Sequence, residues 1–302
     1  MTRALLVAAA LLLAHRAADA CSMAAPCAKL ESSTTPTADG LAAPDASIAA
    51  QHALALARST TPASIEIVAK SLRDRVWVSR VIAAPHGARC LLPPILGALA
   101  ANPTKEARAA FVSLVTSKLW AEDGADASST DRVGALLRAT GSFRPTSPEV
   151  VAMWKQLGAP SVGWASVVTQ SLSENGTTEA AALFEAMLRD TAFELDNRIS
   201  WLHSELLGHR ENPVLLAMAI RLLDAKEREL RIGAIQSVFD YNQRWWGMCG
   251  GPKSVPLATF TAEGRTQLRA LAAKAKKQKL DKTLTQAITR TLAELDKLPP
   301  AK

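Results

Sequence analysis

The fold is decided by a pattern that stands out in Asn212-Pro213-Val214-Leu215-Leu216-Ala217-Met218-Ala219-Ile220-Arg221-Leu222-Leu223. Its large apolar side chains recur at close to the spacing of one helix face. Asn212 offers a capping side chain, and Pro213 stands where a helix accepts proline, at its first position. The stretch therefore predicts an α-helix that starts near Pro213 and buries one side.

The same pattern continues through the chain from about residue 45. Short breakers separate the apolar stripes: Thr61-Pro62, Asn102-Pro103, Ser147-Pro148, Asn175-Gly176 and Asn212-Pro213. Aromatic residues are only 5% of the chain, and Ala and Leu, which are strong helix formers, supply much of its apolar content. These features predict an all-α fold of roughly eleven to thirteen helices joined by short turns.

Two stretches resemble the turns of the HEAT repeat family. Residues 102–110 and 224–234 each place Asn or Asp at a turn and follow it with an arginine, Arg108 or Arg231, among small residues. The resemblance implies that the turn residue caps the second helix of a hairpin, and that the arginine links neighbouring turns. We expect stacked helical hairpins, as a HEAT-like α-solenoid or as an irregular helical array.

The first twenty residues have the layout of a secretory signal peptide. Arg3 precedes an apolar run from Ala4 to Ala14, and Ala18 and Ala20 supply small residues before a cleavage point. The sequence therefore predicts a leader over 1–20 and an exported chain, periplasmic or extracellular. A Ser/Thr/Pro-rich tether is expected over 21–44 and an all-helical domain over 45–302. The apolar run is too short to span a membrane, and we expect no transmembrane helix after it.

Export gives the four cysteines a disulfide-permissive environment. Four cysteines allow three pairings, and we favour Cys90 with Cys249, which leaves Cys21 and Cys27 to pair locally. A second interpretation stays open for Cys21. It stands at the predicted cleavage point, as the lipidated cysteine of a bacterial lipoprotein does, so an acyl anchor there is the alternative to a free N-terminus.

The least helix-like part of the body is the run from Tyr241 to Pro252, which holds two tryptophans and three glycines. Aromatic faces and an arginine can grip a partner or stack on a sugar ring. The candidate binding residues are Tyr241, Arg244, Trp245 and Trp246. The alternative is an inter-helix loop that its tryptophans fold back on the core.

The net charge of +7 is concentrated at one end of the chain. Residues 265–302 hold ten basic and three acidic residues, a surplus equal to that of the whole chain. This segment predicts either a contact with an anionic envelope surface or a solvated face of a terminal helix. Nucleic acid is not an expected partner outside the cell.

No catalytic or cofactor motif stands out. His203 and His209 are six residues apart, which puts them off a common helix face, so we expect solvated side chains and no metal site. Gly163-Trp164-Ala165-Ser166 lacks the final glycine of a nucleophile elbow. Glu194, Asp196 and Glu205 could form an acid–base pair, but their spacing does not distinguish them from an ordinary solvated face.

The sequence thus favours an exported helical binding or scaffolding module of the cell envelope, with an unknown protein partner and no cofactor. The alternative is an all-α envelope enzyme or binder that acts on glycan.

Overall fold

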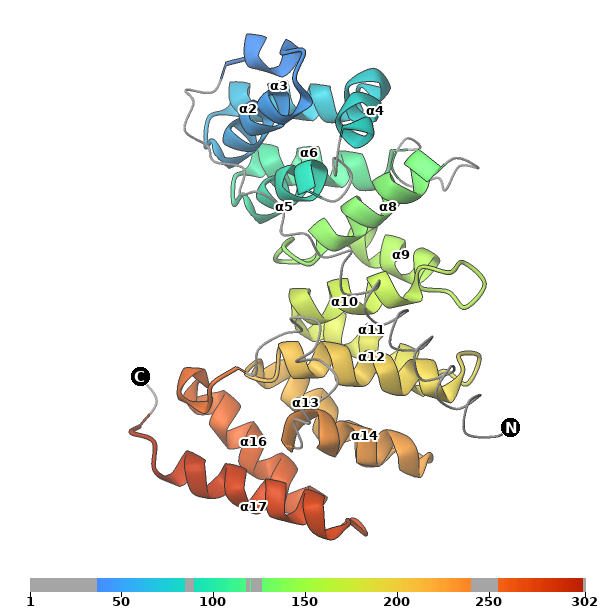
Figure 1. Cartoon of the computed structure of the whole chain (residues 1–302), viewed down its shortest axis with the longest axis vertical. Coiled ribbons are helices and arrows are strands. Elements are labelled where there is room, and N and C mark those ends of the chain that lie inside the picture. Colours follow the sequence, from blue (N-terminus) through green and yellow to red (C-terminus); the bar gives the residue numbers. More distant parts are fainter. Residues whose placement is uncertain (1–36, 85–89, 118–119, 121–126, 240–254, 301–302) are drawn as a thin grey trace, which may run out of the picture.

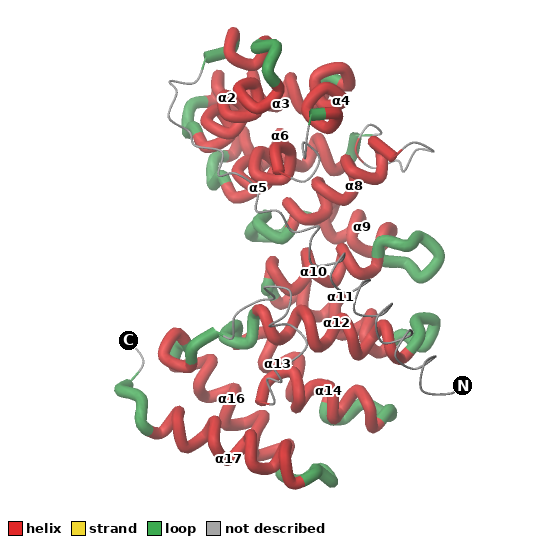
Figure 2. The backbone as a smooth tube through the Cα atoms, in the orientation of Figure 1, coloured by secondary structure: helices red, strands yellow, loops and turns green. Residues whose placement is uncertain are grey.

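The computed structural model describes residues 37–84, 90–117, 120, 127–239 and 255–300. Within these ranges the chain is α-helical with short 3-10 turns and no strand, which confirms the all-α prediction (Figure 2). The helices form an elongated array, with α2 (Ala46–Arg58) at one end and α17 (Lys282–Asp296) at the other (Figure 1). None of the described helices is long and apolar enough to cross a lipid bilayer.

The array consists of two rows of helices. In the first row each helix packs on the next, and the row ends where α14 contacts α17. Between α2 and α17 its members are α5 (Leu92–Ala101), α8 (Ala127–Thr140), α10 (Ala165–Asn175), α12 (Leu195–Gly208) and α14 (Arg228–Phe239).

The second row lies against the first, because the two helices of a hairpin, such as α2 and α3 or α10 and α11, pack on each other. Its members are α3 (Pro62–Arg73), α6 (Lys105–Val115), α9 (Pro148–Leu157), α11 (Thr178–Arg189), α13 (Pro213–Leu222) and α16 (Ala262–Ala275). The described part holds fourteen α-helices, more than expected. One reason is that α4 (Arg75–Ala83) follows α3 after a single residue, Asp74, whose carboxylate caps it by accepting from Val76 N.

Most helices begin where the breakers predict. Ser147 and Asn212 cap α9 and α13, and proline is the first residue of both helices. The expectation that Asn102 caps α6 is wrong, because Thr104 does so by accepting from the backbone N–H of Ala107 at 3.3 Å. The side chain of Asn102 accepts from the Thr104 hydroxyl instead, at 2.8 Å.

Three asparagines, Asn102, Asn175 and Asn212, tie successive hairpins together, and we call them the asparagine clamps. Each follows or ends a helix of the first row, and its amide donates to a backbone carbonyl at or just beyond the end of the preceding helix in that row. Asn102 reaches Ala57 O at 2.9 Å and Ser59 O at 2.8 Å. Asn175 reaches Phe143 O at 2.9 Å, and Asn212 reaches Gly176 O at 3.3 Å. Ala57 lies in the last turn of α2, where a carbonyl has no intrahelical partner, and the other acceptors lie in the turn that follows a helix.

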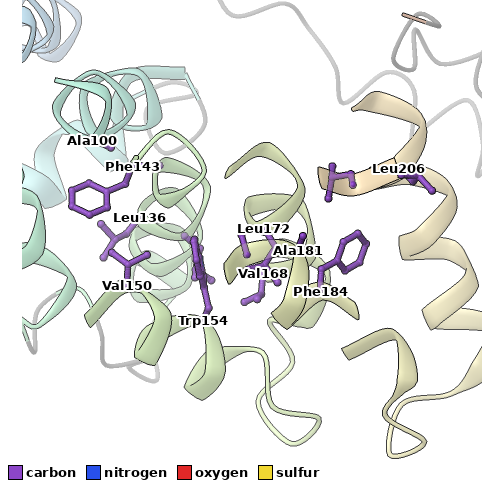
Figure 3. Close-up of a cluster of buried hydrophobic side chains, with 14 of the residues drawn as sticks. Ala100, Leu136, Phe143, Val150, Trp154, Val168, Leu172, Ala181, Phe184 and Leu206 are labelled. Carbon is purple, nitrogen blue, oxygen red and sulfur yellow. The ribbon is translucent and has the colours of Figure 1, made fainter. Parts of the chain in front are cut away.

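The core runs continuously between the rows, with Leu136, Trp154, Leu172, Phe184 and Leu206 succeeding one another along the array (Figure 3). Three of the seven tryptophans, Trp77, Trp120 and Trp154, are buried core residues. Each indole N–H is satisfied, as buried polar groups require: Trp120 Nε1 donates to Leu72 O at 2.8 Å and Trp154 Nε1 to Thr140 Oγ1 at 2.8 Å.

The folded array begins before residue 45, inside the range assigned to the tether. Asp39–Ala42 forms a 3-10 turn, η1, whose Leu41 is buried. The carbonyl of Leu41 accepts from Trp77 Nε1 at 3.0 Å and from Arg80 Nη2 at 2.8 Å. The composition of this range, rich in Ser, Thr and Pro, did not indicate that Leu41 is buried and that its carbonyl accepts hydrogen bonds from α4.

Candidate functional site

The predicted binding residues Tyr241, Arg244, Trp245 and Trp246 lie outside the described residues, as do Cys21, Cys27 and Cys249. Cys90 is half-buried directly before α5 and is not a free thiol. The proposed Cys90–Cys249 pair and the lipidation of Cys21 therefore stay predictions.

Arg210 fixes the described residues on either side of the predicted loop. It follows α12, and its guanidinium donates to Val255 O at 2.6 Å and to Val238 O at 3.4 Å. Two positions seventeen residues apart in the chain thus meet at the end of α12. Two half-buried carboxylates lie nearby in the sequence order of the helices, one on α10 and one on α12.

Glu174 of α10 and Glu205 of α12 form what we call the carboxylate pair. Glu205 is held by two hydroxyls: Ser173 Oγ donates to its Oε2 at 2.9 Å and Ser204 Oγ to its Oε1 at 3.1 Å. Gln170 Nε2 donates to Glu174 Oε1 at 3.2 Å. No described ion pair involves either carboxylate.

Burial raises the pKa of both carboxyl groups. For Glu205 the two serine hydroxyls oppose this effect but do not cancel it. For Glu174 burial is the largest cause and the charge of Glu205 raises the pKa further, whereas the hydrogen bond from Gln170 and the charges of Arg138 and Arg144 lower it without cancelling the rise. A carboxyl group with a raised pKa can hold a proton closer to neutral pH, which is a property of general acids.

The expectation that His203 and His209 are solvated is wrong, because both are half-buried and burial lowers the pKa of each. His203 Nδ1 lies 3.0 Å from Ser237 Oγ on α14. The described residues include no group of three or more side chains arranged to hold a metal ion.

Of the three carboxylates considered from the sequence, the structure brings only Glu205 to this cluster, whereas Glu194 and Asp196 are exposed. Glu174 is not among the residues predicted from the sequence. A signal was present: the dipeptide Ser-Glu occurs at 173–174 and again at 204–205, at the same point of two neighbouring helices of the first row.

Described residues line two shallow hollows to which the carboxylate pair does not contribute. One, of about 390 Å³, adjoins Asn102 and Pro103 at the start of the array. The other, of about 290 Å³, lies between α9 and α11, and its lining includes Trp154, Met187, Phe193, Lys155 and Asp190.

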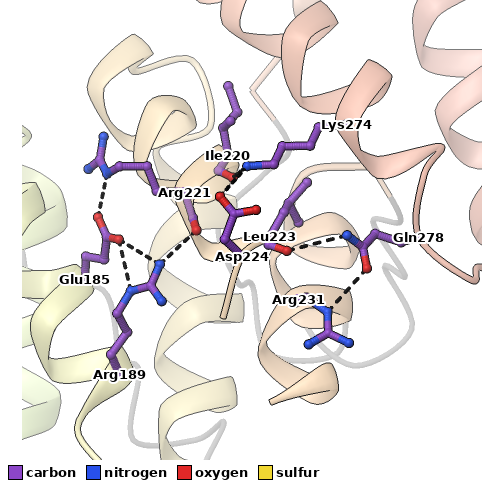
Figure 4. A network of polar contacts seen from close by, with 9 residues as sticks. All are labelled: Glu185, Arg189, Ile220, Arg221, Leu223, Asp224, Arg231, Lys274 and Gln278. Atoms are coloured by element: carbon purple, nitrogen blue, oxygen red, sulfur yellow. Dashed lines mark hydrogen bonds and ion pairs between the residues drawn. The ribbon is translucent and has the colours of Figure 1, made fainter. Parts of the chain in front are cut away.

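The basic segment 265–302 forms α16 and α17, which close the array. Leu268 and Leu271 of α16 and Leu284 and Ile288 of α17 are buried, so both helices pack on their neighbours. Part of the charge has structural partners: Lys274 Nζ lies 2.6 Å from Asp224 Oδ2 (Figure 4), and Arg269 pairs with Asp296 at 2.6 Å.

No protein-family model matches the chain, and a comparison with curated proteins finds no match. The likeness of residues 102–110 and 224–234 to HEAT turns stays a prediction. Arg231, the arginine of the second stretch, donates to Ala225 O and Lys226 O of its own turn, each at 2.8 Å, and to Gln278 Oε1 of the following turn at 3.3 Å.

Proposed function

We propose that this chain is an exported binding or scaffolding module of the cell envelope that holds a protein partner along the side of its helical array. The observation that carries the proposal is the continuous core between the two rows. Each helix buries its apolar face against its neighbours, and the flanks of the array stay available for contact over its whole length. The leader over 1–20 supplies the location.

Tyr241, Arg244, Trp245 and Trp246 are the proposed contact residues, because aromatic and arginine side chains dominate protein interfaces. The test is a crosslinked pull-down of the tagged chain from its native envelope. We expect a stoichiometric partner that is lost with the double variant Trp245→Ala, Trp246→Ala and retained with Val76→Ala. Val76 is a suitable control because it is 78% exposed on α4, far along the array from α14. Equal recovery with both variants contradicts the assignment of the loop.

The alternative function, an all-α envelope enzyme or binder acting on glycan, draws support from the carboxylate pair, since glycoside cleavage uses two carboxyl groups of which one has a raised pKa. Incubation of the chain with purified envelope glycan tests it. Release of sugar that Glu174→Gln and Glu205→Gln each abolish, while both variants stay folded, favours the enzyme. Release that both variants leave unchanged rejects the pair as catalytic.

The state of the N-terminus is tested by mass spectrometry of the chain recovered from its host. A free amine on Cys21 supports a soluble exported module, whereas a diacylglyceryl adduct supports an anchored one. A chain that still carries residues 1–20 contradicts the predicted leader.

A further inference from the structure

The turn between α16 and α17 carries four lysines within seven residues: Lys276, Lys277, Lys279 and Lys282, which we call the lysine turn. All four are exposed, and none takes part in an ion pair or a side-chain hydrogen bond with the described part of the chain. Asp281 is the one acidic residue among them, and its carboxylate accepts from Leu284 N at 2.7 Å as the cap of α17.

The helix dipole explains the placement of only two of these four lysines. A cation is favourable beside the negative C-terminal end of a helix, and Lys276 and Lys277 directly follow α16. Lys282 is the first residue of α17, and Lys279 lies shortly before it. A cation there opposes the positive N-terminal end of the helix dipole. Repulsion among the four ammonium groups adds to this cost, so folding alone does not account for the cluster.

The neighbouring turn, between α13 and α14, extends the basic surface. Gln278 Nε2 donates to Leu223 O at 3.5 Å, which holds the two turns side by side (Figure 4). Lys226 and Arg228 are exposed on that turn, and Arg228 Nη2 reaches Lys279 O at 3.5 Å.

The acidic residues of the same turn offset little of the lysine turn's charge. Asp224 is paired with Lys274 at 2.6 Å, and Glu227 is paired with Arg198 at 3.2 Å. Glu229 is exposed, and it is the one carboxylate of that turn without an ion pair in the described structure. The surplus of positive charge therefore lies on the lysine turn itself.

We propose that the lysine turn, with Lys226 and Arg228, binds the surface of a bilayer that contains acidic phospholipid. Five of the six cations are lysines, which act as compact point charges and do not impose the planar, bidentate geometry of arginine. Neither turn contains an aromatic residue that could stack on a sugar, and neither contributes to the hollows described above.

The contact is purely electrostatic, because the turn has no exposed apolar side chain to insert. Its single leucine, Leu280, is half-buried and packs against the core. Clustered lysines near an acidic membrane each contribute a modest, additive attraction, which salt screens within a Debye length. The contact therefore orients the closing end of the array toward the membrane and is independent of the protein partner proposed above.

The test is co-sedimentation of the full chain, carrying Cys21→Ser so that no acyl group can anchor it, with phosphatidylglycerol–phosphatidylcholine vesicles. Vesicles of phosphatidylcholine alone are the reference. We expect binding only to the acidic vesicles, and loss of that binding at high salt. Replacing all four lysines of the turn by glutamine weakens binding by at least two orders of magnitude, since each charge near the surface is worth roughly fivefold.

The matched control replaces four other exposed lysines, Lys70, Lys105, Lys155 and Lys297, by glutamine, and so changes the net charge equally. It retains binding if the turn is the contact. Equal loss in both variants, or in neither, overturns the proposal. Binding to a soluble anionic polysaccharide that displaces the chain from acidic vesicles at equal charge concentration also overturns it, in favour of a polysaccharide ligand.

Discussion

Glu185 and Glu205 are both half-buried carboxylates between neighbouring helices, yet their surroundings differ. Glu185 of α11 lies between two arginines, with Arg189 at 3.0 Å and Arg221 at 2.7 Å (Figure 4). Glu205 of α12 has two serine hydroxyls and no cation in an ion pair. The charge of Glu185 is thus neutralised in place, whereas Glu205 remains a carboxyl group whose pKa burial raises. The difference marks the carboxylate pair as a place where no ion pair offsets the burial of charge.

The largest expected effect comes from removing a side-chain amide. It tests whether hydrogen bonds from such an amide, and not ion pairs, secure the helix ends next to the carboxylate pair. Asn175 follows Glu174, is 1% exposed, and donates to Phe143 O at 2.9 Å. Asn175→Ala leaves buried carbonyls without a donor and should lower the free energy of unfolding by about 2–3 kcal/mol. Chemical denaturation measures it. Asn197→Ala, at an exposed position of α12, is the control and should change stability little.

Glu185→Gln should cost less, about 1 kcal/mol, because it removes two ion pairs whose arginines are 37% and 51% exposed. The loss should shrink as salt is added, since solvent-exposed pairs are screened. Urea denaturation at low and high salt checks this. A loss that salt does not alter would mean that Glu185 acts through packing and not through charge.

Glu205→Gln should have the opposite sign and a smaller size. Where the wild-type carboxylate is ionised, at alkaline pH, its half-buried charge is unfavourable, so an uncharged amide of the same shape should raise the unfolding free energy by about 0.5 kcal/mol. Salt should leave this gain unchanged. A destabilised variant at alkaline pH would show that the two serine hydroxyls more than compensate the burial of the charge.

The smallest effect is the pH dependence of the unmodified chain. Because burial raises the pKa of Glu174 and Glu205, the folded state binds protons more tightly, and stability falls as pH rises from 4.5 through the folded values. Burial lowers the pKa of His203 and His209, so stability also falls as pH drops below 6.5. The pKa of Glu227 is held low, first by its own backbone N–H and then by Arg198, and this adds stability that is lost in acid below 4.5.

Between pH 4.5 and 6.5 these contributions oppose each other, because the two histidines add stability as pH rises and the two carboxyl groups lose it. The double variant Glu174→Gln, Glu205→Gln removes the opposing part, so its unfolding free energy should rise with pH more steeply than that of the unmodified chain. An unchanged profile in that variant would assign the pH dependence to other groups.

The helical class and the starts of α9 and α13 were predictable, because spacing and capping act within a few residues. The carboxylate pair was not, since periodicity places Glu205 on a helix face without saying that Glu174 of α10 faces it. The role of Asn102 was misjudged for the same reason. Its side-chain amide donates to Ala57 O of α2, a distant partner that a local capping rule does not consider. Counting basic residues in 265–302 likewise could not separate Lys274, which is paired, from Lys279, which is not.

The asparagine clamps also bear on how such a chain can change its length. Each clamp reaches only the helix end that precedes it in the same row, and Asn175 and Asn212 stand 37 residues apart, one hairpin along the array. A duplicated or deleted hairpin would carry its own clamp and find an equivalent carbonyl to bind. A single residue inserted in a turn would displace the amide from its acceptor. Whole hairpins are therefore the units in which this architecture tolerates insertion and loss.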